Sequence, residues 1–300
     1  MSLRSIQSRD NAQYKQLKQW ANSSQARRKS GMTLLDGVHL CEAWLQHRGV
    51  PTLCVVAESA LSHPEVAALV AQCESNTNSN AKSNSNTNSN TNSNTNSNTN
   101  SNTNSNAGAA ECVLLPDVLF TPLGQVENGV GILFAVKVPD TASGGHASPS
   151  LQSAALLLDS VQDPGNLGTI LRTAAAAGIQ QIFCGPGTAA VWSPKVLRAG
   201  MGAHFVLEIT EDVDLVQLIQ QASVPVYATQ PDAPKTIYTA DLRAPSAWLF
   251  GHEGQGVSEQ LLSLATERLA IPQSSQVESL NVAASVAICL FEQRRQQINQ

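Results

Sequence analysis

The chain has 300 residues, 42% of them hydrophobic, and a formal net charge of −5, which suits one large domain or two ordinary ones and excludes a wholly basic nucleic-acid coat protein. It has neither a hydrophobic signal segment nor an apolar run long enough to span a membrane, so we expect a cytoplasmic protein with no membrane partner. The six cysteines are widely spaced, without the spacing of metal ligands or of a redox pair, and predict free thiols and no metal site.

The first 30 residues are strongly basic. They hold seven basic side chains and one acidic side chain, a net charge of +6, so the rest of the chain carries −11. A basic segment on an acidic body suits a polyanionic partner such as RNA, although a solvated amphipathic helix has the same composition. The candidate RNA-binding residues are Arg9, Lys15, Arg27, Arg28 and Lys29.

Residues 1–138 are expected to form a small α/β domain. Apolar spacing of three and four residues predicts a first helix over residues 9–29, which Asn11 can cap. Further helices are predicted at residues 38–47 and 64–73, and strands at residues 32–35, 51–57, 111–115 and 130–138.

Residues 75–106 interrupt this domain with a tract made almost entirely of Ser, Asn and Thr. The tract has no apolar residue beyond Ala81, so it can bury nothing to offset the entropy lost on ordering, and we predict a disordered insertion. The apolar segment at residues 111–115 looks like another strand of the same domain. The Ser-, Gly- and Pro-rich residues 139–150 are predicted to form the linker.

From residue 151 to residue 300 apolar strands alternate with helices. Strands are predicted at residues 154–158, 181–184, 205–209, 224–228, 247–250 and 269–271, and helices at residues 166–177, 193–201, 212–221, 258–266 and 281–296. This alternation predicts an α/β domain with a mostly parallel sheet covered on both faces. Ligands then belong at the carboxyl ends of the strands.

The first stretch with candidate chemistry begins just after the first strand of this second domain. A turn starts at Asp163, Asn166 can cap the next helix, and Gly168 permits close backbone approach. Arg172 lies roughly 9 Å beyond Asn166 along the helix axis, at 1.5 Å per residue. Its neighbours in the sequence are mostly apolar, and burying an unpaired charge among such residues is costly. Arg172 is either a fork for phosphate or carboxylate, or a structural lock paired with Asp159 or Asp163.

The second stretch is a glycine-rich loop after the fifth strand of this domain. Gly251, Gly254 and Gly256 lack the spacing of a dinucleotide fingerprint, and no Gly-Lys-Ser/Thr follows as in a P-loop. Glu253 would repel a phosphate, so the loop suits a ligand that carries a hydroxyl or an ammonium group. For His252 we favour an ordinary surface position.

The third stretch follows the last predicted strand. Pro272 ends that strand because proline has no N–H to donate. Ser279, Leu280 and Asn281 open the last helix, beside a loop whose free backbone groups can hold polar or anionic groups. An ordinary βα turn with a serine cap would have the same sequence.

Together the three stretches resemble the three motifs of the SpoU (TrmH-like) family, the RNA ribose 2′-O-methyltransferases of the SPOUT superfamily. The residues that match are Asp163, Pro164, Asn166, Gly168 and Arg172 in the first motif, Gly251, Glu253, Gly254 and Gly256 in the second, and Ile271, Pro272, Ser279, Leu280, Asn281 and Val282 in the third. The resemblance covers residues 151–300. The first domain is more weakly similar to the substrate-binding domain of the family.

The resemblance implies methylation of a ribose 2′-hydroxyl in structured RNA, with S-adenosylmethionine as methyl donor and no metal. It also implies a C-terminal trefoil knot and a homodimer with the active site at the subunit interface. The residues that match donor-binding positions are Thr229, Gly251, Ile271 and Leu280, and those that match the catalytic centre are Asn166, Arg172, Glu253, Ser279 and Asn281. Because a separate substrate-binding domain is present, we favour 23S-type ribosomal RNA over transfer RNA.

Two alternatives concern individual roles. Arg172 matches the base proposed for the family, but a free guanidinium stays protonated, so we expect it chiefly to grip the target phosphate and orient the hydroxyl. Glu253 either orders the knot loop or pairs with Arg172. Two features depart from the family pattern: Gly200 stands where serine is common, and the Ser/Asn/Thr tract is not a family feature.

Three rival functions remain open in the sequence. These are a transfer RNA 2′-O-methyltransferase, a SPOUT enzyme that methylates a base nitrogen, and a non-catalytic knotted protein that only binds RNA. Asn166 and Arg172 argue against the second, and the intact motifs argue against the third.

Overall fold

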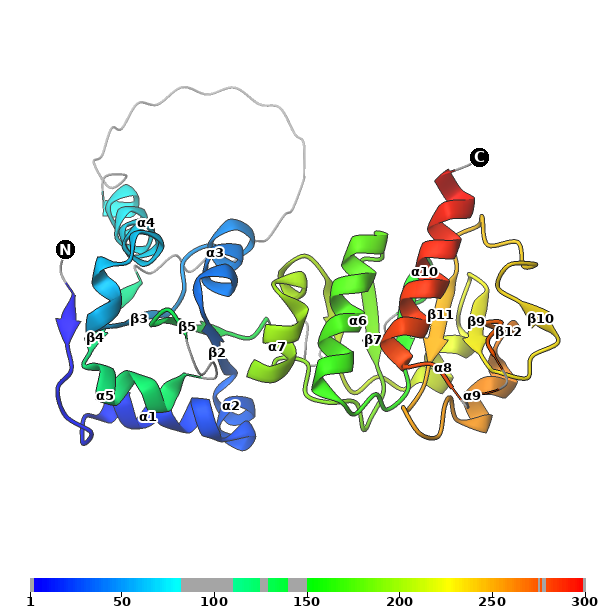
Figure 1. The fold of residues 1–300 in the computed structure, drawn as a ribbon, viewed down its shortest axis with the longest axis horizontal. Coiled ribbons are helices and arrows are strands. Elements are labelled where there is room, and N and C mark those ends of the chain that lie inside the picture. The colour runs from blue at the N-terminus through cyan, green and yellow to red at the C-terminus, as the bar shows by residue number, and fades with distance from the viewer. Residues whose placement is uncertain are drawn as a thin grey trace, which may run out of the picture. The chain divides into compact units, whose positions relative to one another are not determined.

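The structure, a computed structural model, describes residues 3–81, 110–124, 129–139, 150–274, 276 and 279–298. The chain divides into two compact units (Figure 1). The N-terminal unit comprises Met1–Asn22 and Asp36–Lys137, and the C-terminal unit comprises Ser23–Leu35 and Val138–Gln300. Within the described residues, no helix has the length and apolar character needed to cross a bilayer.

The first 137 residues of the chain contain a five-stranded mixed sheet, in the order β1-β4-β3-β5-β2. Its strands are β1 (Arg4–Ser5), β2 (Met32–Asp36), β3 (Leu53–Ala57), β4 (Glu111–Leu115) and β5 (Ile132–Lys137). β4 runs parallel to β1 and β3, whereas β5 runs antiparallel to β3. Every residue of β3 is buried, as its uninterrupted apolar sequence predicts for a strand covered on both faces.

The first predicted helix is in fact two helices. The helices of this part of the chain are α1 (Ala12–Asn22), α2 (Ser24–Ser30), α3 (Val38–His47), α4 (Pro64–Ala81) and α5 (Asp117–Phe120), with short 3₁₀ helices at Glu58–Ser62 and Thr121–Leu123. Ser23 breaks the predicted helix because it is extended and its hydroxyl caps α2, accepting from the N–H of Ala26 at 3.2 Å. The predicted cap of α1 is confirmed, since Asn11 Oδ1 accepts from the N–H of Gln13 at 2.9 Å.

The Ser/Asn/Thr tract begins inside a helix rather than in disordered chain. α4 continues to Ala81, so the prediction of disorder is wrong for residues 75–81. Each residue added to an existing helix gains a hydrogen bond, which lets α4 extend past its apolar part. The rest of the tract, from residue 82, and residues 140–149 of the predicted linker lie outside the described residues. β4, which follows the tract, pairs with β3 along its whole length.

The C-terminal unit contains a seven-stranded sheet in the order β10-β12-β9-β11-β6-β7-β8, and every pair in it is parallel. The strands are β6 (Ala155–Leu158), β7 (Gln181–Cys184), β8 (Glu208–Thr210), β9 (Val226–Thr229), β10 (Lys235–Thr236), β11 (Ala247–Phe250) and β12 (Glu267–Ala270). The predicted parallel sheet is therefore confirmed. The chain adds β7 and β8 on one side of β6 and the later strands on the other, so the order reverses between β6 and β11, where open sheets place ligands.

Helices cover both faces of this sheet. They are α6 (Pro164–Ala177), α7 (Pro194–Gly200), α8 (Leu215–Gln220), α9 (Glu259–Leu264) and α10 (Val282–Ile298). Figure 1 shows α6 and α10 side by side, and the two helices pack together. The predicted strand at residues 205–209 starts only at Glu208, because Ala203–Phe205 forms a 3₁₀ helix. The two-residue strand β10 was not predicted.

A buried polar network fixes α10 on its face of the sheet. Trp248 of β11 is fully buried, and its Nε1 donates to Oε1 of Gln293 on α10 at 2.8 Å. The Nε2 of Gln293 donates in turn to the hydroxyl of Ser246 at 2.6 Å. Since both ends of the Gln293 amide are used, the helix can sit on the sheet in one register only.

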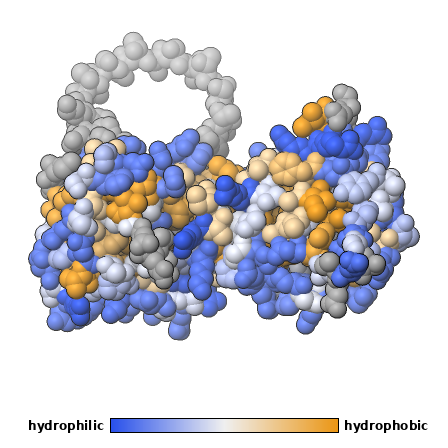
Figure 2. Space-filling view, in the orientation of Figure 1, coloured by the Kyte–Doolittle hydropathy of each residue, from blue (hydrophilic) through white to orange (hydrophobic). Residues whose placement is uncertain are grey.

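Some large apolar side chains of the C-terminal unit remain exposed. On α10, Phe291 is 47% and Ile298 is 68% exposed, and they lie seven residues apart and so on one face of the helix. Met201 and Val206 are also exposed. Figure 2 shows apolar surface between hydrophilic areas on the visible face of this unit.

Candidate active site

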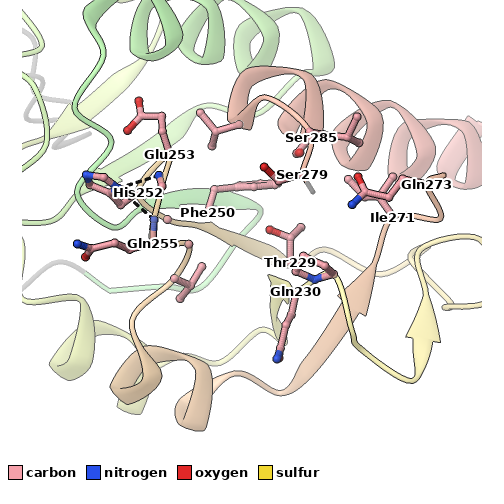
Figure 3. Close-up of a pocket in the computed structure, with 17 residues that line it drawn as sticks. Thr229, Gln230, Phe250, His252, Glu253, Gln255, Ile271, Gln273, Ser279 and Ser285 are labelled. Atoms are coloured by element: carbon pink, nitrogen blue, oxygen red, sulfur yellow. Dashed lines mark hydrogen bonds between the residues drawn. The ribbon is translucent and has the colours of Figure 1, made fainter. Parts of the chain in front are cut away.

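A cavity of about 300 Å³ opens at the carboxyl ends of β9, β11 and β12, beside the start of α10 (Figure 3). All four residues predicted to bind the donor line this cavity. Thr229 ends β9, Gly251 follows β11, Ile271 follows β12, and Leu280 precedes α10. Residues that are up to 51 positions apart in the sequence are thus brought to one place, because parallel strands all present their carboxyl ends at the same edge.

The loop after β11 is closed tightly on itself. The N–H of His252 donates to the carbonyl of Gly256 at 2.9 Å, and the N–H of Gly256 donates back at 2.8 Å. The backbone of this closed loop passes so near Gly251 that a Cβ there would lie 2.1 Å from the carbonyl carbon of Gly256. Glycine is therefore required at position 251 by close backbone approach.

His252 is not the ordinary surface residue that the sequence suggested. Its side chain is half-buried, it lines the cavity, and its Nδ1 accepts from the N–H groups of Gly254 and Gln255 at 2.9 and 3.2 Å. No sequence signal identifies this role, because a histidine in a glycine-rich loop has many possible partners.

Glu253 joins the loop after β11 to the loop after β6. Its carboxylate accepts from the N–H of Gln162 at 3.1 Å, the N–H of Asp163 at 2.9 Å and Nδ2 of Asn166 at 3.2 Å. Partial burial acts to raise the pKa of Glu253, but these donors outweigh it and lower the pKa below its usual value. Of its two predicted roles, the structure supports loop ordering.

A second pair of side chains carries this connection on to α10. Nδ2 of Asn281 donates to Oδ1 of Asn166 at 2.9 Å, and Oδ1 of Asn281 accepts from the N–H of Ala283 at 2.9 Å, which caps the helix. A continuous chain of hydrogen bonds therefore runs from Glu253 through Asn166 to Asn281. It joins one residue from each of the three sequence stretches.

Two capping predictions need correction. Asn166 does not cap α6, because the helix already begins at Pro164 and Asp163 caps it, accepting from the N–H of Asn166 at 2.7 Å. α10 is not capped by a serine, as the sequence also allowed, but by Asn281, whose Oδ1 accepts from the N–H groups of Ala283 and Ala284. Ser279, predicted for the catalytic centre, is exposed and lines the cavity.

Arg172 stands apart from this network. It is exposed on α6, it does not line the cavity, and within the described residues it has no hydrogen bond or ion pair. The structural lock is therefore not formed, and the carboxylates of Asp159 and Asp163 instead accept from the N–H groups of Ser258 and Asn166. The guanidinium of Arg172 is available to a ligand.

Gly168 and Gly200 both lie where α6 and α7 pack closely. A Cβ on Gly168 would lie 2.4 Å from Cβ of Ala199, so the predicted close approach is confirmed. A Cβ on Gly200 would lie 2.6 Å from the ring of His204, which is fully buried and hydrogen-bonds the carbonyl of Val191 at 3.0 Å. Glycine at position 200 thus leaves room for this imidazole.

The candidate RNA-binding residues fall in both units. Arg9 and Lys15 belong to the N-terminal unit, where Lys15 forms an exposed ion pair with Asp10 at 3.0 Å. Arg27, Arg28 and Lys29 lie in the last turn of α2, within the C-terminal unit. Burial and the neighbouring charge of Arg28 lower the pKa of Arg27. The described residues contain no cluster of three or more metal-ligating side chains.

Replacing Glu253 with glutamine is expected to loosen the two loops that it joins. One carboxylate oxygen becomes an NH₂ group that faces backbone N–H donors, which should cost about 1–2 kcal/mol of stability. Hydrogen exchange should then rise in residues 159–166 and 251–258. Because the pKa of Glu253 is lowered, the wild-type connection should persist as pH falls through the usual glutamate range and be lost only below it.

Glu259→Gln is the matched control, because Glu259 is exposed in the first turn of α9. Equal exchange in both variants would contradict the assigned role of Glu253. Thermal unfolding of the two proteins provides the second measurement.

Comparison with known proteins identifies relatives of this chain. A family model described as the SpoU rRNA methylase family matches residues 153–291. An uncharacterized tRNA/rRNA methyltransferase of Synechocystis is 32% identical to this chain, in an alignment that spans 98% of this chain and 94% of that protein. The 23S rRNA (guanosine(2553)-2′-O)-methyltransferase RlmP of Bacillus subtilis is 34% identical, in an alignment that spans 61% of this chain and 73% of that protein. A solved RNA 2′-O ribose methyltransferase superposes with a TM-score of 0.73 at 26% identity, covering 98% of this chain and 99% of the other.

Proposed function

Because this chain belongs to the SpoU family of RNA methyltransferases, we propose that it methylates a ribose 2′-hydroxyl of structured RNA with S-adenosylmethionine as methyl donor. The observation that carries the proposal is the cavity at the ends of β9, β11 and β12, next to the hydrogen-bond chain from Glu253 to Asn281. Residues from all three motifs converge there. The cavity is the donor site in this proposal.

The lining of the cavity fits such a donor. Apolar side chains, including Ile271 and Leu280, can cover the adenine, and the backbone of the glycine loop supplies hydrogen-bonding groups at its edge. Thr229 and Ser279 add hydroxyls for the polar parts of the ligand. The Glu253 carboxylate already accepts three hydrogen bonds from the chain, so its role is to shape the site.

The residues of the chain act mainly by positioning. When bound, S-adenosylmethionine supplies a methyl group that is already activated on a sulfonium sulfur. The chain must then hold the 2′-hydroxyl in line with that group. Arg172, exposed and without a partner within the described residues, grips the target phosphate and orients the hydroxyl, while Asn166 and Ser279 contact the reacting ribose.

Ribosomal RNA of the 23S type is the proposed substrate. RlmP, which covers much of this chain, is named for that substrate. Residues 1–138, without the segment at residues 23–35 that belongs to the C-terminal unit, are proposed as the substrate-binding domain. Arg9 and Lys15 of that domain contact phosphate in this proposal, and so do Arg27, Arg28 and Lys29 of α2. All six cysteines are free thiols, which supports a reducing compartment such as the cytoplasm.

Two further properties belong to the proposal. The loops that follow β11 and β12, from which Gly251 and Ile271 line the cavity, form the trefoil knot of the catalytic domain at residues 151–300 in this proposal. The active enzyme is a homodimer, for which the exposed apolar face of α10 with Phe291 and Ile298 supplies contact area. Light scattering of the purified chain should give twice the mass of one chain.

The test is transfer of labelled methyl groups to unmodified ribosomal RNA and unmodified transfer RNA, assayed side by side. We expect label in ribosomal RNA at a ribose that resists nuclease cleavage on its 3′ side. Label only in transfer RNA would show that transfer RNA, and not ribosomal RNA, is the substrate. Labelled RNA that nuclease still cleaves at the labelled nucleotide would indicate methylation of a base. Donor binding without transfer to either RNA would refute the proposed ribosomal substrate, and no donor binding would indicate a protein that only binds RNA.

A further inference from the structure

The imidazole of His252 is part of the loop that closes one side of the cavity (Figure 3). Its Nδ1 accepts from the N–H groups of Gly254 and Gln255. These donors lie two and three residues after His252, which is the pattern of an Asx-turn, normally closed by an asparagine or aspartate side chain. Here the accepting atom belongs instead to a ring that can take up a proton.

Only the neutral imidazole can hold the loop in this way. While Nδ1 accepts two hydrogen bonds, the ring hydrogen must be on Nε2. A protonated imidazole carries hydrogen on both nitrogens, so a donor at Nδ1 would face the N–H groups of Gly254 and Gln255. Both hydrogen bonds would be lost. Histidine is the side chain that commonly makes this change between pH 5 and 8.

Few other titratable groups near the loop can change their protonation in a similar way. Among the described residues that line the cavity, Glu253 is the other titratable one, and its lowered pKa keeps it ionised as pH falls. The neighbouring segments carry Asp159 and Asp163 after β6 and Asp232 after β9. His204, in the same unit, stays neutral, because burial lowers its pKa to about 4.

We propose that His252 is a positioning residue that makes donor binding depend on pH. The neutral ring holds the loop in the shape that binds the donor, and protonation releases the loop. This inference rests on the proposed function, because it takes the cavity to be the donor site. Since the bound state needs Nδ1 as an acceptor, donor affinity is highest while the ring is neutral and falls as the ring takes up a proton.

The test measures binding of S-adenosylhomocysteine to the full chain by calorimetry between about pH 5.5 and 8. His252→Asn keeps an acceptor in the Asx-turn position but does not titrate in that range, and His252→Ala removes the acceptor. His47→Asn, at an exposed histidine on α3 in the N-terminal unit, is the matched control. The neighbouring carboxylates are present in every variant, so their contribution to the pH profile appears in all of them.

The wild type and His47→Asn should lose affinity on the order of tenfold at the acidic end, as expected for two hydrogen bonds. His252→Asn should bind as tightly as the wild type at the basic end and show little pH dependence, whereas His252→Ala should bind weakly throughout. A pH dependence as large in His252→Asn as in the wild type, or a flat profile in the wild type, would overturn the inference.

A second measurement separates this inference from the proposed function. If the folded wild type binds no donor at any pH, the donor site itself is refuted. Hydrogen exchange of the amides of Gly254 and Gln255 then still reports on the loop. Protection that is lost at acidic pH in the wild type but not in His252→Asn supports the switch, and equal protection in both proteins overturns it.

Discussion

Replacing Arg172 with alanine is expected to lower kcat for RNA methylation about a thousandfold, or about 4 kcal/mol in the activation free energy, while donor affinity stays within about twofold. The separation of the two effects follows from where Arg172 lies. It is exposed on α6 outside the donor cavity, and it has no hydrogen bond or ion pair within the described residues. Its loss should remove an interaction with the RNA and leave the donor site intact.

The measurement pairs single-turnover methylation with calorimetric binding of S-adenosylhomocysteine. Arg172→Lys should recover only part of the rate, because a lysine keeps the charge but lacks the planar fork that holds phosphate with two hydrogen bonds. Arg243→Ala is the control, since Arg243 is exposed and paired with Asp241 at 2.6 Å, away from the cavity lining. Donor affinity that falls in parallel with activity in Arg172→Ala would contradict the assigned role.

Replacing Gly251 with alanine is expected to weaken donor binding about a hundredfold, or roughly 3 kcal/mol. The new Cβ would lie 2.1 Å from the carbonyl carbon and oxygen of Gly256 and 2.2 Å from the backbone nitrogen of Val257. These are backbone atoms and cannot rotate away, so the loop must open. Opening breaks the two hydrogen bonds between His252 and Gly256 and displaces the wall of the cavity.

Gly254→Ala is the matched control in the same loop. A Cβ at Gly254 would meet only the ring of His252 at 3.7 Å, an ordinary van der Waals contact, so this variant should bind the donor nearly as well as the wild type. Binding of S-adenosylhomocysteine by calorimetry and thermal unfolding by circular dichroism would be compared for the two variants. Equal affinities would show that the close approach at Gly251 does not shape the donor site.

Local patterns in the sequence predicted several elements with the bounds that the structure shows. The strands at residues 181–184 and 247–250 and the helix at residues 38–47 have the predicted bounds, because an uninterrupted apolar run or a helical period marks them clearly. The helix predicted at residues 9–29 failed at Ser23, where a hydroxyl caps a new helix within an otherwise continuous pattern. A single capping hydrogen bond decided between one helix and two.

The site, like the fold, was predicted in part from the sequence. Thr229, Gly251, Ile271 and Leu280 converge as predicted, since the carboxyl ends of parallel strands share an edge of the sheet. The roles of Asn166 and His252 were assigned differently from the sequence. Each has a side chain that can cap, donate or accept, and only its surroundings select among these possibilities.

The sequence by itself determined the alternation of strands and helices, the three loops that follow β6, β11 and β12, and the residue types available in them, because these depend on local periodicity and turn chemistry. Only the tertiary structure decided that Glu253 binds Asn166 and that Asn166 binds Asn281, across 87 and 115 residues of chain. Such partners are chosen by the strand order, which places β11 beside β6. No local pattern encodes that order, because it results from how the whole sheet buries its apolar faces.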